Sequence, residues 1–185
     1  MKFTEQLDHY TPTCPQEEKD REVILSYLRC FDDLLTRDNE FAHFTASSFI
    51  VNRERTKTLL CYHNLYDSWA WTGGHADGDD DLLAVAIREA QEETGAQTRP
   101  LYPGIYTLDI LPVWGHVKRG HYVSSHQHLN FTYLLEADER QPLATKPDEN
   151  SGVQWVPIDQ MLTYSTEREM HPVYQKLIDK LHLYG

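Results

Sequence analysis

The sequence predicts an α/β protein in which a mixed β-sheet lies between helices, and three observations support this fold class. Apolar side chains recur at helical spacing in three segments, near the start, in the middle and at the end of the chain. Runs rich in β-branched and aromatic residues separate these segments. The order helix, strands, helix, strands, helix fits one domain, residues 1–185, whose sheet is covered on both faces.

Residues 1–40 are expected to form an N-terminal arm and a helix that packs on the rest of the domain. Residues 1–15 contain two prolines and show no clear period, which is typical of an irregular lead-in. From Gln16 to about Arg37 the apolar positions fall at helical spacing, and acidic residues fill the first turn. We interpret the apolar stripe as a packing face; the surface of a homodimer is the alternative.

Five segments have strand-like composition, and a sixth is extended. Residues 43–52 and 57–63 flank a polar turn and predict a hairpin. Trp69 and Trp71 then alternate in an extended segment, where they either pack beneath the central helix or let Trp71 bind a nucleotide base. Residues 106–117 and 126–136 predict two further strands, joined by a basic connection that includes Arg119. A short strand at 153–156 and a helix at 171–182 close the chain.

His126 and His128 lie on the polar face of the predicted strand 126–136, because side chains two residues apart point to the same side. Two histidines at this spacing are compatible with a metal site. The sequence offers no third histidine or cysteine at a recognised spacing, which disfavours zinc. We therefore interpret them, together with Arg119, as a wall that faces a substrate.

Composition excludes several function classes. The chain has 29 acidic and 17 basic residues and a net charge of -12, which argues against nonspecific binding to nucleic acid or to an anionic membrane. No segment approaches the ~20 apolar residues of a membrane span, and no secretory signal pattern is seen. The three cysteines lack paired spacing, so we expect free thiols in a cytoplasmic protein.

The stretch from Gly73 to Ala96 carries the chemistry. Two glycines precede an acidic run, and a helix follows that ends at Gly95. Helical spacing of three and four residues places Glu89, Glu92 and Glu93 on one patch. Their mutual repulsion is tolerated on a solvated helix face or is relieved by a hard divalent cation such as Mg2+ or Mn2+. Spacing alone leaves both explanations open.

The full pattern resembles the signature of the Nudix hydrolases. Gly74 is followed by five residues, Asp80, seven residues and the segment REAQEETGA at 88–96. The family consensus is G, five residues, E, seven residues and REUXEEXGU, with U aliphatic. The match covers only this loop and helix. It departs from the consensus at Asp80, where the family has Glu, and has alanine at both U positions.

The resemblance implies a Nudix-like α/β/α sandwich and a hydrolase that cleaves the pyrophosphate bond of a nucleoside diphosphate linked to another moiety. Pro112, sixteen residues after Ala96, resembles the ADP-ribose pyrophosphatase branch and favours an ADP-ribose-like substrate. A nucleoside triphosphate pyrophosphatase, or an inactive nucleotide-sensing module, is the alternative. In each case the partner is a small nucleotide derivative.

The resemblance also implies roles for the residues of the motif. Mg2+ or Mn2+ would be held by carboxylates and a glycine carbonyl, with Glu89 as general base or third ligand. Arg88 would orient a neighbouring carboxylate, and Asp80 would anchor water around the metal. A further carboxylate is expected on the late loop 142–150, where Glu149 and Asp148 are both candidates. The metal ligands implied are Gly74, Glu89, Glu92 and Glu93.

Overall fold

The structure is a computed structural model that describes residues 2–118 and 120–184. Its helices are α1 (Phe3–His9), α2 (Pro15–Cys30), α3 (Leu82–Thr94), α4 (Met161–Tyr164) and α5 (His171–Lys180), with short 3-10 turns at Ile158–Gln160, Arg168–Met170 and Leu181–Tyr184. Its strands are β1 (Ala42–Val51), β2 (Lys57–His63), β3 (Ser68–Ala70), β4 (Thr72–His75), β5 (Thr98–Pro100), β6 (Thr107–Val113), β7 (His116–Lys118), β8 (His121–Val123), β9 (His126–Ala137) and β10 (Asn150–Pro157).

Strand β1 lies at the centre of an eight-stranded mixed sheet with the order β10-β2-β1-β9-β5. It runs parallel to β9 from the pair Ala42 and Gln127 to the pair Val51 and Glu136. It pairs antiparallel with β2 and β4, while β6 pairs antiparallel with β9 and β3 with β2. The predicted hairpin of the first two strands is confirmed, and the two later predicted strands are present as the paired β6 and β9.

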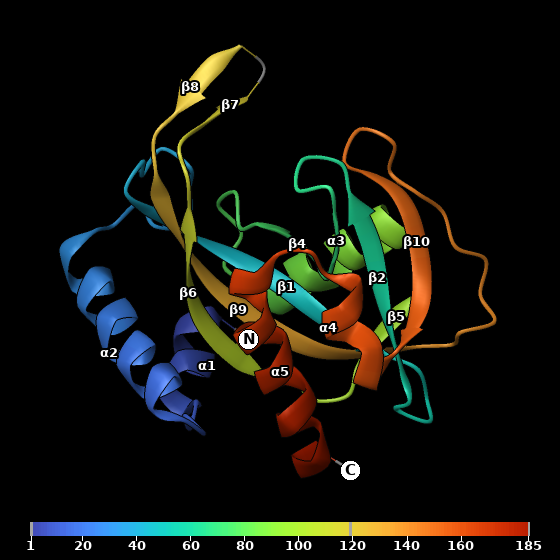
Figure 1. Cartoon of the computed structure of the whole chain (residues 1–185). Helices are drawn as coiled ribbons and strands as arrows, with labels where there is room; N and C mark the ends of the chain where they lie inside the picture. Colours follow the sequence, from blue (N-terminus) through green and yellow to red (C-terminus); the bar gives the residue numbers. More distant parts are fainter. Residues whose placement is uncertain (1, 119, 185) are drawn as a thin grey trace.

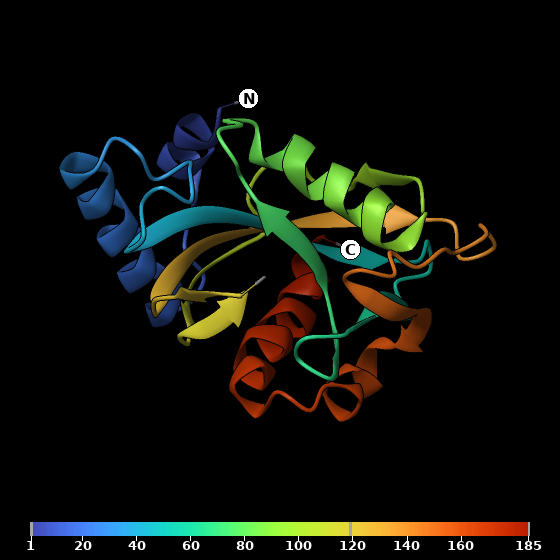
Figure 2. The same ribbon diagram turned by 90° about the horizontal axis from the view of Figure 1, so that it is seen from above.

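Helices cover both faces of the sheet, as Figure 2 shows, with α3 (green) on one side and α5 (red) on the other. The α3 side holds a core in which Leu82, Val85 and Ala86 meet Phe44 and Phe131. The α5 side has its own core, in which side chains of α4 and α5 pack against β1, β2 and β9. The predicted α/β/α sandwich with a mixed sheet is confirmed.

The N-terminal segment differs from the prediction. Residues Phe3–His9 form a helix instead of an irregular lead-in, because Phe3 and Leu7 are buried and the Phe3 ring lies 4.7 Å from that of Phe44. Tertiary packing stabilises such a short helix where local propensity would not. The second helix also ends earlier than predicted, at Cys30. Beyond it, Leu34 lies in a turn; its side chain is buried, and its carbonyl accepts a backbone hydrogen bond from Phe44 of β1.

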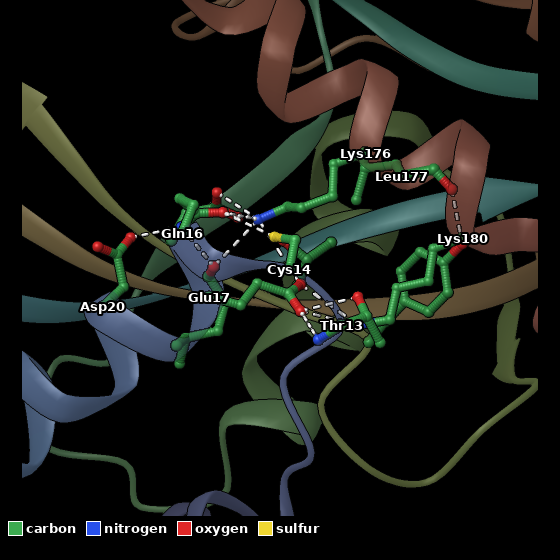
Figure 3. A network of polar contacts seen from close by, with 12 residues as sticks. Thr13, Cys14, Gln16, Glu17, Asp20, Lys176, Leu177 and Lys180 are labelled. Atoms are coloured by element: carbon green, nitrogen blue, oxygen red, sulfur yellow. Dashed lines mark hydrogen bonds and ion pairs between the residues drawn. The ribbon is translucent and has the colours of Figure 1, made fainter.

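A buried ionic network ties α2 to β6 and α5 (Figure 3). The Glu17 side chain is fully buried; it accepts hydrogen bonds from the Thr13 backbone at 2.8 Å and from Lys180 at 3.3 Å. Lys176 is 2.7 Å from Asp109 and 3.7 Å from Glu17. Burial alone would raise the pKa of Glu17, but the hydrogen bonds and the two lysines lower it below its ordinary value. The network therefore fixes α2 against α5.

Strands β7 and β8 form a separate hairpin that extends away from the body of the molecule (Figure 1). It exposes large apolar side chains, among them Tyr122, and Trp114 is exposed just before it. Among the described residues, no helix is both long and apolar enough to cross a bilayer.

Candidate functional site

Helix α3 has the ends that its sequence predicts. Asp81 precedes it, and the Asp81 carboxylate accepts a hydrogen bond from the backbone N–H of Ala84 at 3.2 Å. Gly95 follows it with a φ of 73°, in the left-handed region that favours glycine. Ala86 and Ala90 are buried against the sheet. These small side chains let the helix approach β1 and β4 closely, and they set the rotation that places the glutamates toward β4.

The glycines of β4 meet the glutamates of α3 directly. The backbone N–H of Gly73 donates a hydrogen bond to Oε1 of Glu93 at 3.0 Å. A Cβ atom on Gly74 would lie 2.7 Å from Cγ of Glu89 and 2.8 Å from its Oε1, closer than carbon or oxygen atoms approach without a bond. Position 74 therefore needs glycine because a carboxylate occupies the space that any other side chain would require.

Burial makes two carboxylates of this group, those of Glu89 and Glu93, unusually basic. Glu93 is only 4% exposed, and burial raises its pKa to about 7, although hydrogen bonds from Gly73 and from the Cys61 thiol at 3.3 Å act against the rise. Burial, followed by the charge of Glu92, also raises the pKa of Glu89. The Cys61 thiol is buried beneath Glu93, and burial together with this carboxylate raises the pKa of the thiol. For Glu89, the charges of Lys146 and Arg88 act against the rise in pKa but do not cancel it.

The loop before β10 supplies a lysine and a fourth carboxylate. Nζ of Lys146 lies 3.2 Å from Oε2 of Glu92 and 3.0 Å from Oε1 of Glu149. Burial would lower the pKa of Lys146, but its hydrogen bonds to these two carboxylates raise it above its ordinary value. The Asn150 side chain donates to the Glu93 carbonyl at 2.9 Å and anchors the loop to the end of α3. Of the two predicted loop carboxylates, the structure brings Glu149 to the group through Lys146.

Comparison with known families agrees with this geometry. The model of the NUDIX domain matches residues 42–181, which is most of the chain. The chain belongs to the Nudix hydrolase family. Helix α3 is therefore its Nudix helix.

One curated relative is the CMP-5'-(N-acetyl-N-hydroxy-3-aminopropyl)phosphonate hydrolase of Streptomyces rubellomurinus (strain ATCC 31215). It is 29% identical over 119 residues, which are 62% of this chain and 52% of that protein, so the chain matches about half the length of this relative. Among solved structures, a NUDIX family hydrolase from Clostridium perfringens is 22% identical, with a TM-score of 0.55, over 77% of this chain and 98% of that one. A C. elegans Ap4A hydrolase is 18% identical, with a TM-score of 0.51, over 75% and 97%. These structures share the fold.

Arg88 of the Nudix signature pairs with Asp79 and not with Asp80, the acidic residue at the signature position. Nη1 of Arg88 lies 3.4 Å from Oδ2 of Asp79, and Nη2 lies 3.9 Å from Oε1 of Glu89. Asp80, the residue at the signature position, instead pairs with Lys2 at 2.9 Å. The spacing of the motif selects Asp80 from a run of three aspartates, Asp79 to Asp81. Only the fold shows that Asp79 is the member that lies beside Arg88.

Two residues predicted to bind substrate lie elsewhere or are not described. The Trp71 ring is 5.5 Å from that of Tyr174 in α5, and Trp69 packs edge-on against Tyr62. Both tryptophans belong to the core on the α5 side, so they pack as predicted but on the sheet face opposite the Nudix helix. Arg119 lies outside the described residues.

His126 and His128 occupy the polar face of β9 as predicted, with ring centroids 5.1 Å apart. The structure adds two neighbours that sequence reasoning missed. The His43 ring is 4.8 Å from that of His126 and 5.1 Å from that of His128, and the His75 ring is 5.0 Å from that of His128. No spacing in the sequence signals this group, because its members come from three strands. His43 and His75 supply the further histidines that the sequence spacing did not reveal, so the lack of a recognised spacing does not exclude zinc.

Proposed function

We propose that this protein is a metal-dependent hydrolase that cleaves the pyrophosphate bond of a nucleoside diphosphate linked to another moiety. The observation that carries the proposal is the convergence of Glu89 and Glu93 on the Gly73–Gly74 backbone, with the exposed Glu92 close enough to raise the pKa of Glu89. It is the arrangement that the Nudix signature implies. Membership of the Nudix hydrolase family supports the reaction class.

The residues present fit Mg2+ or Mn2+. Carboxylate and backbone carbonyl oxygens are the ligands that these hard cations prefer, and Gly74 with the three glutamates offers both kinds. Burial raises the pKa values of Glu89 and Glu93, and a bound cation would offset the cost of keeping these buried carboxylates ionised. Lys146 already places an ammonium group between Glu92 and Glu149. When bound, the divalent cation neutralises the diphosphate and polarises a phosphoryl oxygen.

The side chains have separable roles in this proposal. Glu92 and Glu93, with the Gly74 carbonyl, hold the cation. Glu89 accepts a proton from the attacking water, and its raised pKa brings its basicity closer to that of an effective general base at neutral pH.

Arg88 and Glu149 support these roles from either side of the helix. Arg88 lies between Asp79 and Glu89 and fixes the orientation of Glu89. Glu149 is the second candidate for the base, since it lies on a loop that the Nudix helix anchors. Asp80 is paired with Lys2. It could hold water around the bound cation only if this ion pair opened.

An ADP-ribose-like compound is the substrate that we favour. The curated relative acts, by its name, on a nucleoside monophosphate joined to a phosphonate that is not a nucleotide, and this supports a substrate with one nucleoside and one other group. The negative net charge of -12 requires that the diphosphate be met by local positive charge. The bound cation and Lys146 supply it.

The proposal is tested by incubating the protein with Mg2+ or Mn2+ and a panel of ADP-ribose, nucleotide sugars, dinucleoside polyphosphates and nucleoside triphosphates. Products are separated by chromatography. We expect metal-dependent cleavage of ADP-ribose or a nucleotide sugar, with chelation abolishing it. Preferred cleavage of triphosphates would reassign the substrate. Tight nucleotide binding with no turnover of any panel member would support a sensing module instead.

Three variants assign the roles. Glu92→Gln and Glu93→Gln should each lower metal-dependent turnover by at least about tenfold, as loss of metal affinity does. Glu89→Gln should lower kcat by about 100-fold or more, as loss of a general base does. The matched control is Glu18→Gln, which changes an exposed helical glutamate far from the site. Full activity in both Glu92→Gln and Glu93→Gln would refute the assignment of the metal site.

A further inference from the structure

Four histidines gather on the sheet face opposite the Nudix helix, outside the carboxylate group. Potential ligand nitrogens of His43, His75 and His128 all lie within 4.8 Å of one another. His126 lies beside them, with its Nε2 atom 3.3 Å from Nε2 of His128. His43 is 4% exposed and the other three are half-buried. Such a concentration of imidazoles has no part in the reaction proposed above.

Strand register explains the grouping. In the parallel pair of β1 and β9, His43 lies directly opposite His128, so the two side chains share a face. In the antiparallel pair of β1 and β4, His75 lies opposite Thr45, which is on the same face as His43. Neighbouring strands are about 4.8 Å apart, and the imidazole rings inherit this separation. The grouping is therefore a property of the sheet and does not depend on a flexible loop.

His43 has the protonation pattern of a metal ligand. Its Nδ1 atom is 3.1 Å from the carbonyl oxygen of Asn39, which can only accept, so Nδ1 carries the hydrogen. The lone pair is left on Nε2, which is buried and has no hydrogen-bond partner among the described residues. A backbone carbonyl that holds the far nitrogen of a ligating histidine is a common second-shell arrangement at metal sites. An unpartnered buried nitrogen costs stability unless a ligand occupies it.

His126 and His128 already have the separation that a metal would require. Ligand nitrogens 2.0–2.1 Å from a tetrahedral Zn2+ are about 3.4 Å apart, and the two Nε2 atoms are 3.3 Å apart. Nδ1 of His126 is 2.8 Å from the Ser124 carbonyl oxygen, which again assigns the hydrogen to Nδ1 and the lone pair to Nε2. The ligand nitrogens of His43, His75 and His128 lie within 4.8 Å of one another, so they would have to approach by at most about 1.4 Å on binding.

We propose that His43, His75 and His128 bind a transition-metal ion of the zinc class, with His126 as the fourth ligand. Imidazole suits Zn2+ and its neighbours, whereas Mg2+ and Mn2+ favour oxygen, so the two groups on the two faces of the sheet select different metals. A phosphate group is the competing ligand. It would require charged imidazolium rings, whereas the hydrogen bonds from Nδ1 of His43 and His126 to backbone carbonyls leave a lone pair on each Nε2, which is the form that coordinates a metal.

Metal binding by the purified full chain tests the proposal. The protein is treated with a chelator and titrated with Zn2+ against a coloured competitor in the presence of excess Mg2+. We expect one equivalent of tightly bound Zn2+, an increase in Tm on Zn2+ addition, and, with Co2+ as the probe, the strong visible absorption of a four-coordinate site. His128→Gln, a half-buried change that leaves His43 in place, should lower Zn2+ affinity by at least about tenfold. His43→Gln should do the same, provided that it folds.

Two controls separate this site from the carboxylate group. His116→Gln changes a histidine on the β7–β8 hairpin and should bind Zn2+ like the unchanged protein. Glu92→Gln should retain Zn2+ binding while losing metal-dependent hydrolysis, so failure of one proposal is distinguishable from failure of the other. Equal Zn2+ affinity in the unchanged protein and His128→Gln, or loss of tight Zn2+ binding in Glu92→Gln alone, would overturn the histidine site.

Discussion

Glu93 couples the stability of the metal-free protein to pH. Burial raises the pKa of this carboxyl from an ordinary value of 4.5 to about 7 in the folded chain. Below pH 4.5 the group is protonated in both the folded and the unfolded state. Between pH 4.5 and about 7 the unfolded chain releases the proton while the folded chain keeps it, so stability falls as pH rises. Above about pH 7 both states are ionised and the loss is complete.

The magnitude follows from the same two values. Moving a pKa from 4.5 to about 7 corresponds to about 3 kcal/mol in the free energy of unfolding. Glu93→Gln removes the ionisation but keeps an oxygen that accepts from the Gly73 N–H. The metal-free variant should therefore be more stable than the unchanged protein at pH 8, by up to about 3 kcal/mol. The two should have similar stability at pH 4.5.

Urea unfolding of the chelator-treated proteins, followed by circular dichroism at several pH values, measures the difference. Other titrating groups are common to both chains and largely cancel. Addition of Mg2+ or Mn2+ should then stabilise the unchanged protein at pH 8, by about 2.7 kcal/mol at a hundred times Kd, and the variant much less. A difference between the two metal-free proteins that stays constant from pH 4.5 to pH 8 would refute the reasoning.

Three further substitutions test the structure. Gly74→Ala should lower kcat by displacing the Glu89 carboxylate from the space that a Cβ would enter, and unchanged kinetics would contradict that contact. Lys180→Met leaves the fully buried Glu17 with a weaker partner and should cost about 3 kcal/mol by urea unfolding; a cost below about 1 kcal/mol would show that the pair is not buried in solution. Phe3→Ala should lower the free energy of unfolding by about 3 kcal/mol, whereas an irregular N-terminal arm would leave it unchanged.

Much of the fold was predictable because each element carries its own local signal. The period-two pattern of residues 126–136 and the apolar stripe of residues 171–182 both correspond to observed elements. Within the expected irregular lead-in, residues Phe3–His9 are helical for a physical reason, while residues 10–14 are irregular as predicted. Helix α1 is short, and this segment is helical because Phe3 and Leu7 are buried, with Phe3 packed against Phe44 of the sheet. Information of that kind lies in the partner surface and is absent from the segment itself.

The same distinction between local and tertiary information applies to the candidate site. Glu89, Glu92 and Glu93 could be grouped from the sequence because a helix relates them at fixed spacing. Asp79 and Glu149 could not be selected over their neighbours, since a turn and a loop determine which member of an acidic run reaches the helix. The placement of Trp71 required knowledge of which sheet face α5 covers.

Strand β4 explains how the two proposed metal-binding groups, which differ in chemistry, can lie so close in sequence. Successive side chains of a strand point to opposite faces, so Gly74 faces Glu89 of the Nudix helix while His75 faces His43 and His128. The sheet therefore separates an oxygen-rich group from a nitrogen-rich group by the thickness of one strand. Because the same backbone supports both, Zn2+ on the histidine face should hold Gly74 in position against Glu89. The carboxylate geometry would then depend on the histidine site even though no ligand is shared.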